Sequence, residues 1–120
     1  MILGLSVTLP AVVGQQHALE MLYTGKRVDG EEAARIGLCD RLVPLADLRD
    51  AATSLAAEIA TSAPLAVRSI RQTMRGHLAP AVRAALVREK AEQDRLVLTE
   101  DWAEGVRATA ERREPEFVGR

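Results

Sequence analysis

Apolar residues recur at helical spacing in the middle of the chain. Four of them follow the pattern i, i+4, i+7, i+11, namely Leu48, Ala52, Leu55 and Ile59. This spacing places them on one face of an α-helix, with polar residues opposite. The pattern stops before residues 62–64, which are Ser-Ala-Pro. It therefore predicts an amphipathic helix that begins near Leu48 and ends before residue 62.

Prolines and glycines divide the other apolar segments into helices. Proline suits the first turn of a helix and glycine commonly follows its end. Acidic residues at 100–101 and basic residues at 112–113 fit the two ends of a helix dipole. The predicted elements are a helix from Pro10 to Gly14, a helix over 15–24 ended by Gly25, a helix opened by Pro64, a long helix opened by Pro80, and a last helix over 100–113.

Residues 24–48 combine a helix start, a helix end and a short extended run. Asp29 can accept hydrogen bonds from the first turn of a helix, where the two following glutamates also complement the helix dipole. Gly37 tolerates positive φ and ends this helix after two turns. Residues 38–43 mix polar and apolar side chains before Pro44, which predicts one short strand.

Three cations share one face of the helix that Pro64 opens. Arg68, Arg71 and Arg75 are spaced i, i+3, i+7 with no acid between them. Two interpretations remain open. The face is a phosphate-binding patch, for coenzyme A or nucleic acid, or it is a solvated face whose neutralising acids lie on other helices.

The size and composition of the chain limit the core that it can build. A chain of 120 residues and 13.0 kDa buries ~65% of its unfolded surface if it packs alone. Its helices are rich in alanine and it has one Trp, one Tyr and one Phe. Thin apolar stripes bury little area, so we expect the helices to need the surface of a partner.

Charge and cysteine content narrow the function classes. Sixteen basic and seventeen acidic residues give a formal charge of -1, so no net field attracts nucleic acid or an anionic membrane. Cys39 is the only cysteine, which excludes an internal disulfide, and we expect a small buried thiol. His17 and His77 each lack a second ligand at helical spacing, so we expect no metal site.

We expect no targeting segment in this sequence. Residues 1–9 have no basic region and too short an apolar run for a signal peptide, and no apolar stretch approaches the ~20 residues that span a bilayer. We expect a soluble cytoplasmic protein. The abundance of arginine and alanine is typical of bacterial proteins encoded by GC-rich genes.

Residues 24–48 also follow the pattern Thr-Gly-x-Arg-Val-x-x-x-Glu-Ala-x-x-x-Gly-Leu-x-Asp-x-Leu-Val-Pro-x-x-x-Leu. This pattern resembles a segment in the C-terminal half of enoyl-CoA hydratases and isomerases, the crotonase family. Residues 9–14, Leu-Pro-Ala-Val-Val-Gly, are similar to the Leu-Pro-Arg-x-Val-Gly run of that family. Gly4 resembles one glycine of the family's Gly-rich turn, and Leu5 stands where another glycine is common.

The resemblance covers essentially the whole chain but only the C-terminal half of the family's domain. It implies a mainly α structure, the helical C-terminal region of a crotonase-like (ClpP/crotonase) α/β fold without its β-spiral core. We expect a single helical region over 1–120. Residues 1–43 are expected to form helices plus a short strand after the active-site loop, and residues 44–120 the C-terminal helices.

The family's reaction adds water to, or shifts, a double bond conjugated to a thioester carbonyl. This chemistry needs backbone N–H donors for the enolate oxygen and one or two carboxylates that move protons. In relatives these groups precede the region that resembles this chain. We therefore assign no catalytic residue and no cofactor besides the coenzyme A of the substrate, and expect the chain alone to be inactive. The carboxylates considered are Asp29, Glu31, Glu32, Glu100 and Asp101.

One binding residue follows from the resemblance. The last helix resembles the family's terminal helix, whose Phe-x-x-Lys/Arg motif contacts the nucleotide end of coenzyme A. Arg112 falls on the basic position and can pair with a phosphate, while Thr109 replaces the aromatic residue. Alternatively, Arg112 only complements the helix dipole.

The expected partners are acyl-CoA, if the N-terminal half is supplied, and a homo-oligomer (a trimer or a dimer of trimers) or a full-length family member. A second hypothesis is a non-catalytic helical module for oligomerisation or partner binding. A third, a nucleic-acid binder built on the three cations at 68, 71 and 75, lacks a recognition motif and stacking aromatics.

Overall fold

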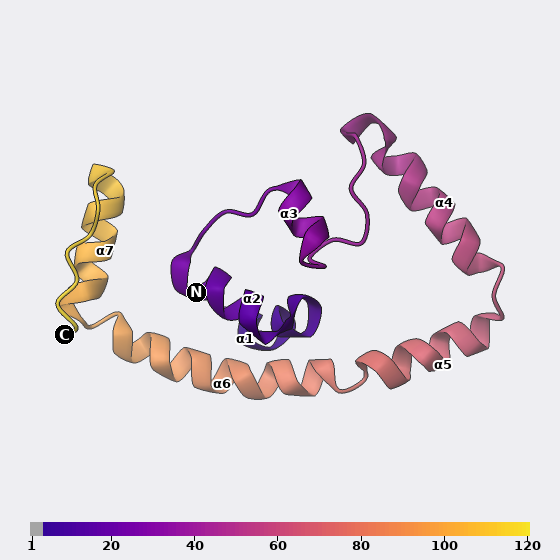
Figure 1. Cartoon of the computed structure of the whole chain (residues 1–120). Coiled ribbons are helices and arrows are strands. Elements are labelled where there is room, and N and C mark those ends of the chain that lie inside the picture. Colours follow the sequence, from indigo (N-terminus) through magenta and orange to yellow (C-terminus); the bar gives the residue numbers. More distant parts are fainter. Residues whose placement is uncertain (1–3) are drawn as a thin grey trace.

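The computed structural model describes residues 4–120, and its N-terminal part consists of three helices. These are α1 (Leu5–Thr8), α2 (Pro10–Thr24) and α3 (Gly30–Arg35) (Figure 1). Gly14 has φ 77° and ψ 163°, so α2 is kinked where two helices were predicted to meet. Gly25, at φ 62°, ends α2 as predicted.

The predicted start of α3 is confirmed. The Asp29 carboxylate accepts a hydrogen bond of 2.9 Å from the Glu32 N–H, and two glutamates occupy the first turn. The helix ends at Arg35, and Gly37 follows at φ 76°. The short helix is therefore specified by its own capping residues.

The predicted strand over 38–43 is wrong. This segment is irregular, and no strand occurs within residues 4–120. A strand forms by hydrogen bonding to a neighbouring strand, and no other segment within residues 4–120 forms one. The segment instead leads through the short 3-10 helix η1 (Leu45–Asp47) into the next helix.

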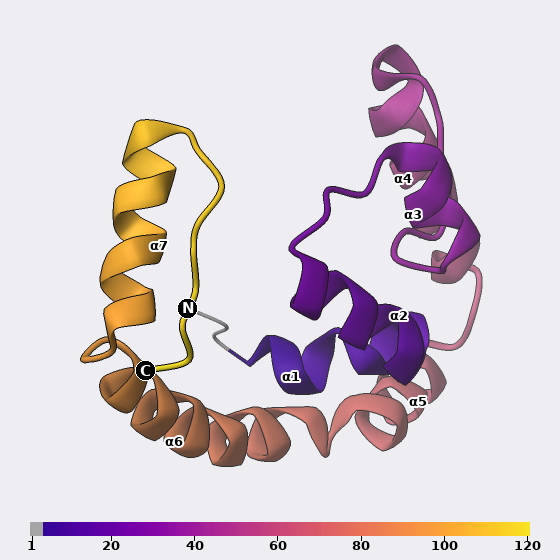
Figure 2. The same cartoon turned by 60° about the vertical axis from the view of Figure 1, so that its left-hand side comes forward.

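Four helices then follow end to end. They are α4 (Leu48–Ala60), α5 (Pro64–Arg75), α6 (Leu78–Leu96) and α7 (Glu100–Glu111). Figures 1 and 2 show them as an arc around α1 and α2, with α7 turning up at one end. The helices predicted at 48, 64 and 100 begin as expected, whereas α6 begins two residues before Pro80.

The core lies within the N-terminal helices and is small. Leu9, Val13, Ala18 and Ile36 are buried together. A second contact joins α1 to α6: the Gly4 N–H donates to the Glu89 carboxylate at 2.8 Å, and the Ser6 hydroxyl donates to the same carboxylate. These two donors, the Ser6 hydroxyl first, lower the pKa of Glu89. This contact connects the N-terminal helices to the arc.

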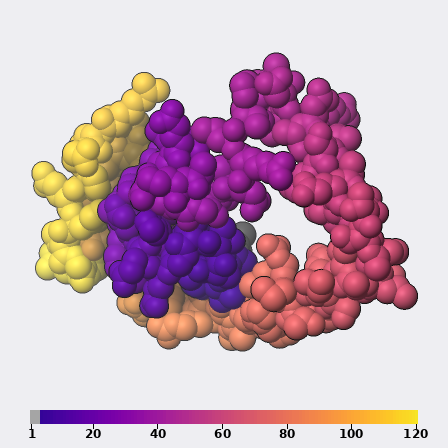
Figure 3. Space-filling model, turned by 45° about the vertical axis from the view of Figure 1, so that its right-hand side comes forward, coloured from indigo at the N-terminus to yellow at the C-terminus, as the bar shows by residue number. Residues whose placement is uncertain are grey.

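The chain is more open than its length predicts. Its radius of gyration is 19.2 Å, against ~14 Å for a compact domain of this length. The accessible surface is 9948 Å², against ~6,300 Å² for a monomer of this mass. About half of the unfolded surface is thus buried, rather than the ~65% expected of a chain that packs alone. Figure 3 shows open space between the N-terminal helices and the α4–α5 arm.

The apolar face of α4 is a helix face without a cover. Leu48 is 55% exposed and Ile59 is 49% exposed, although both belong to the predicted stripe. The helix itself is confirmed, but its apolar side packs against little of the described chain. None of the helices that the structure describes has the length and apolarity needed to cross a bilayer.

Candidate ligand site on the last helix

The last helix, α7, starts at a capping residue that the sequence prediction missed. The Thr99 hydroxyl accepts a hydrogen bond of 3.2 Å from the Trp102 N–H. Thr99 directly precedes two acids, a pattern typical of a helix start. The cap sets where α7 begins.

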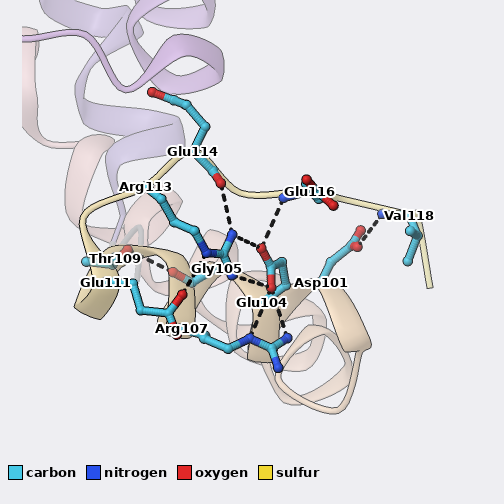
Figure 4. A network of polar contacts seen from close by, with 10 residues as sticks. All are labelled: Asp101, Glu104, Gly105, Arg107, Thr109, Glu111, Arg113, Glu114, Glu116 and Val118. Atoms are coloured by element: carbon cyan, nitrogen blue, oxygen red, sulfur yellow. Dashed lines mark hydrogen bonds and ion pairs between the residues drawn. The ribbon is translucent and has the colours of Figure 1, made fainter.

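The C-terminal tail, residues 113–120, folds back along α7. The Asp101 carboxylate accepts hydrogen bonds from the N–H groups of Val118 (2.7 Å) and Gly119 (2.9 Å). The Asp101 N–H in turn donates to the carbonyl of Arg120 at 3.1 Å. Asp101 was predicted only as a first-turn acid, and it also holds the tail (Figure 4).

Glu104 is the centre of this network. Its carboxylate accepts hydrogen bonds from Arg113 at 2.5 Å, from Arg107 at 2.9 Å and from the Glu116 N–H at 3.1 Å. Its side chain is only 12% exposed. The hydrogen bond from Arg113, followed by that from the Glu116 N–H, lowers the pKa of Glu104 to about 2. We call the contacts of Asp101 and Glu104 with residues 113–120 the tail clasp.

The tail clasp brings an aromatic residue of the tail onto α7. Phe117 lies over Gly105, where an added Cβ would be 3.6 Å from the Phe117 ring. An open pocket results, lined by Asp101, Trp102, Gly105, Val106, Thr109 and Phe117. The Thr109 hydroxyl donates to the Gly105 carbonyl at 2.8 Å, so its polar group is already bonded. Two aromatic rings and a valine therefore offer a surface suited to a planar ring.

Arg112 lies at the end of α7 in a left-handed conformation, at φ 56° and ψ 41°. Its neighbour Arg113 is paired with Glu104 and Glu111, an arrangement that raises the pKa of Arg113. Within residues 4–120 no acid pairs with Arg112. The guanidinium of Arg112 is therefore free to bind a phosphate. The predicted contact with coenzyme A itself stays a prediction.

The carboxylates weighed as catalytic groups mostly have other partners. Asp29 caps α3, Glu32 pairs with Arg35, and Glu100 pairs with Arg120. Asp101 holds the tail. Cys39, expected to be buried, is half-buried beside Leu38. These placements give no reason to assign a catalytic role to any of them.

Phe117 and Glu104 were missed as site residues by sequence reasoning. Trp102, Gly105 and Thr109 are spaced at i, i+3, i+7, which places them on one helix face. A glycine between two larger residues on such a face leaves room for a side chain from elsewhere. That spacing was the available sign of the pocket, although it does not name Phe117 as the occupant.

The family model for enoyl-CoA hydratase/isomerase matches residues 2–120 of this chain. Putative enoyl-CoA hydratase/isomerase YngF of Bacillus subtilis is 33% identical over 92% of the chain and 43% of its own length. Carnitinyl-CoA dehydratase of Proteus mirabilis is 38% identical over 92% of the chain and 42% of its length. An enoyl-CoA hydratase/isomerase structure from Pseudoalteromonas atlantica superposes with a TM-score of 0.79 at 29% identity, covering 96% of this chain and 46% of that one.

These matches define a helical region of the crotonase fold, and the chain belongs to the enoyl-CoA hydratase/isomerase family. The predicted family and the predicted mainly helical fold class are confirmed. The chain spans less than half the length of the relatives that it matches. The division of the chain into residues 1–43 and 44–120 stays a prediction.

Proposed function

We propose that this chain is the helical C-terminal segment of an enoyl-CoA hydratase/isomerase-like protein that acts on acyl-CoA thioesters. Within that protein, α7 and its tail bind the nucleotide end of coenzyme A. Coenzyme A belongs to the substrate, and the proposal needs no further cofactor. The free Arg112 guanidinium at the end of α7, where the resemblance expects a phosphate contact, carries this proposal.

Two features of α7 support a nucleotide ligand. The guanidinium of Arg112 has no competing carboxylate among residues 4–120, so it can donate charge-assisted hydrogen bonds to a phosphate. Trp102 and Phe117 line a pocket on the same helix and replace the aromatic surface that Thr109 lacks. The names of relatives such as carnitinyl-CoA dehydratase refer to acyl-CoA chemistry.

Replacing Arg112 with glutamine is expected to weaken coenzyme A binding by roughly three- to tenfold, because one charge-assisted contact is lost. Calorimetric titration of the chain with coenzyme A measures this change. Arg49→Gln is the matched control, since Arg49 is exposed on α4 and also has no acid partner among residues 4–120. Equal losses in both variants would contradict a specific contact at Arg112.

The chain alone is expected not to hydrate crotonyl-CoA. The reaction needs proton-transferring carboxylates beside backbone N–H donors, and we propose that a further segment supplies both. The measurement is the absorbance of the enoyl thioester after addition of the purified chain. A full-length relative serves as the positive control, and turnover by the chain alone would overturn this part of the proposal.

We further propose that a partner covers the apolar face of the α4–α5 arm. Leu65 is 76% exposed and Met74 is 68% exposed, and such large apolar exposure is typical of an interaction surface. The proposed partner is either further copies of the same chain, which form a trimer or a dimer of trimers, or a full-length family member. This observation also favours the alternative of a non-catalytic helical module. Sedimentation equilibrium tests it, and a stable, non-aggregating monomer that binds no relative would argue against both.

A further inference from the structure

A second basic site lies at the junction of α5 and α6, far along the chain from α7. After α5 the chain turns at Gly76 and continues into α6 (Figure 1). A cleft lies at this junction. Arg71, Gln72 and Arg75 line it from α5, while Val82 and Arg83 line it from α6. The cleft therefore gathers three arginines and one amide from two separate elements.

The arginines of this cleft lack the partners that many others in the chain have. Arg35, Arg95 and Arg107 each pair with a glutamate three residues earlier on the same helix. Across residues 4–120, no carboxylate lies within ion-pair distance of Arg71, Arg75 or Arg83. The sequence left two interpretations of the cations on α5 open. The described residues do not support neutralisation by acids on other helices, because none of those acids forms an ion pair with these arginines.

The cations of this cluster repel one another, and a bound anion would relieve that repulsion. Arg71 and Arg75 are at i and i+4 on α5, where like charges repel one another. Arg83 adds a third positive charge from α6, the next helix along the chain. A guanidinium presents a planar fork of donors that matches the oxygens of a phosphate, and Gln72 adds a neutral donor. Two adjacent phosphates match three forks better than one phosphate does.

We propose that the α5–α6 cleft binds a diphosphate group through Arg71, Arg75 and Arg83. Arg68 shares the helix but does not line the cleft, so the cation face predicted from the sequence is divided. The ligand is either free pyrophosphate or the diphosphate of a nucleotide. This inference is independent of the ligand proposed for Arg112.

Titration of the 120-residue chain with pyrophosphate, at ionic strength held constant with sodium chloride, tests the site. Arginine Nε–H resonances in nitrogen-15 NMR spectra report binding residue by residue. The expected result is a saturable shift at Arg71, Arg75 and Arg83, and a roughly tenfold weaker affinity in Arg75→Gln. Arg68→Gln is the matched control, because it removes the same charge from the same helix outside the cleft, and its affinity should stay within about twofold of the original.

A second arm separates the two sources of the diphosphate. ADP binding much more tightly than pyrophosphate indicates a nucleotide, whereas equal affinities indicate the free anion. The Nε–H shifts of Arg71, Arg75 and Arg83 are read separately from that of Arg112, which keeps this test separate from that of α7. The proposal is overturned if the shifts do not saturate, if sodium chloride alone produces them, or if Arg68→Gln weakens binding as much as Arg75→Gln. Circular dichroism checks that each variant keeps its helices.

Discussion

Replacing Gly4 with valine is expected to separate α1 from α6. Gly4 has φ 77°, a left-handed conformation that costs a residue with a Cβ ~1–2 kcal/mol. A Cβ at this position would also lie 2.9 Å from Cγ1 of Val82. Val82 cannot swing aside, because a β-branched side chain in a helix has one strongly preferred rotamer. The α1–α6 contact should therefore lose ~2 kcal/mol or more, the strain and the clash together.

Amide hydrogen exchange measures this loss directly. In Gly4→Val, the amides of α1 should exchange faster, and the Gly4 N–H should no longer be held by Glu89. Gly25→Val is the matched control: Gly25 has φ 62°, and a Cβ added there would meet no atom within 4 Å, so this variant carries the strain without the clash. If both variants leave α1 equally protected, the Val82 contact does not hold the N-terminal helices to the arc.

The helices of this chain were predictable because their signals are local. Asp29 caps α3, Pro64 opens α5 and Gly25 ends α2, each through its own backbone preference or a neighbouring N–H group. None of these effects depends on distant parts of the chain. Because these predictions were correct, the helix boundaries in this chain are set by residues within about one helical turn.

The failures concern interactions between segments. The run over 38–43 has a pattern typical of a strand, but pattern alone does not supply the neighbour that a strand needs. Likewise, the spacing of Leu48 and Ile59 identifies the apolar face of α4 without stating what covers it. Both segments therefore have the composition of buried elements and lie open in this chain.

The candidate site was predictable to the same extent. Arg112 was chosen through its place in a pattern, and its phosphate contact stays a prediction. The tail clasp was not predictable, because Asp101 meets Val118 and Gly119 across a chain reversal. The helix dipole already explains why an acid stands in the first turn of a helix. The sequence therefore gives no sign that Asp101 also binds the tail.

Replacing Glu104 with glutamine is expected to release the C-terminal tail from α7. The change keeps the size of the side chain but removes the charge that pairs with Arg113 and Arg107. The Glu116 N–H also loses a charged acceptor. Amide exchange at Glu116 should accelerate by about tenfold or more, because the segment opens more often. Glu114→Gln is the matched control, since Arg113 contacts only the backbone carbonyl of that residue.

The same carboxylate makes the tail clasp sensitive to acid. The pKa of Glu104 is about 2 in the folded chain, below the ordinary value of 4.5. A lowered carboxylate pKa stabilises the clasp fully above pH 4.5, and this stabilisation is lost as the pH falls toward 2. Fluorescence of Trp102, the only tryptophan, should follow the release because Phe117 lines the same pocket. Glu104→Gln should abolish this acid transition, and a transition that persists unchanged in the variant would contradict its assignment to Glu104.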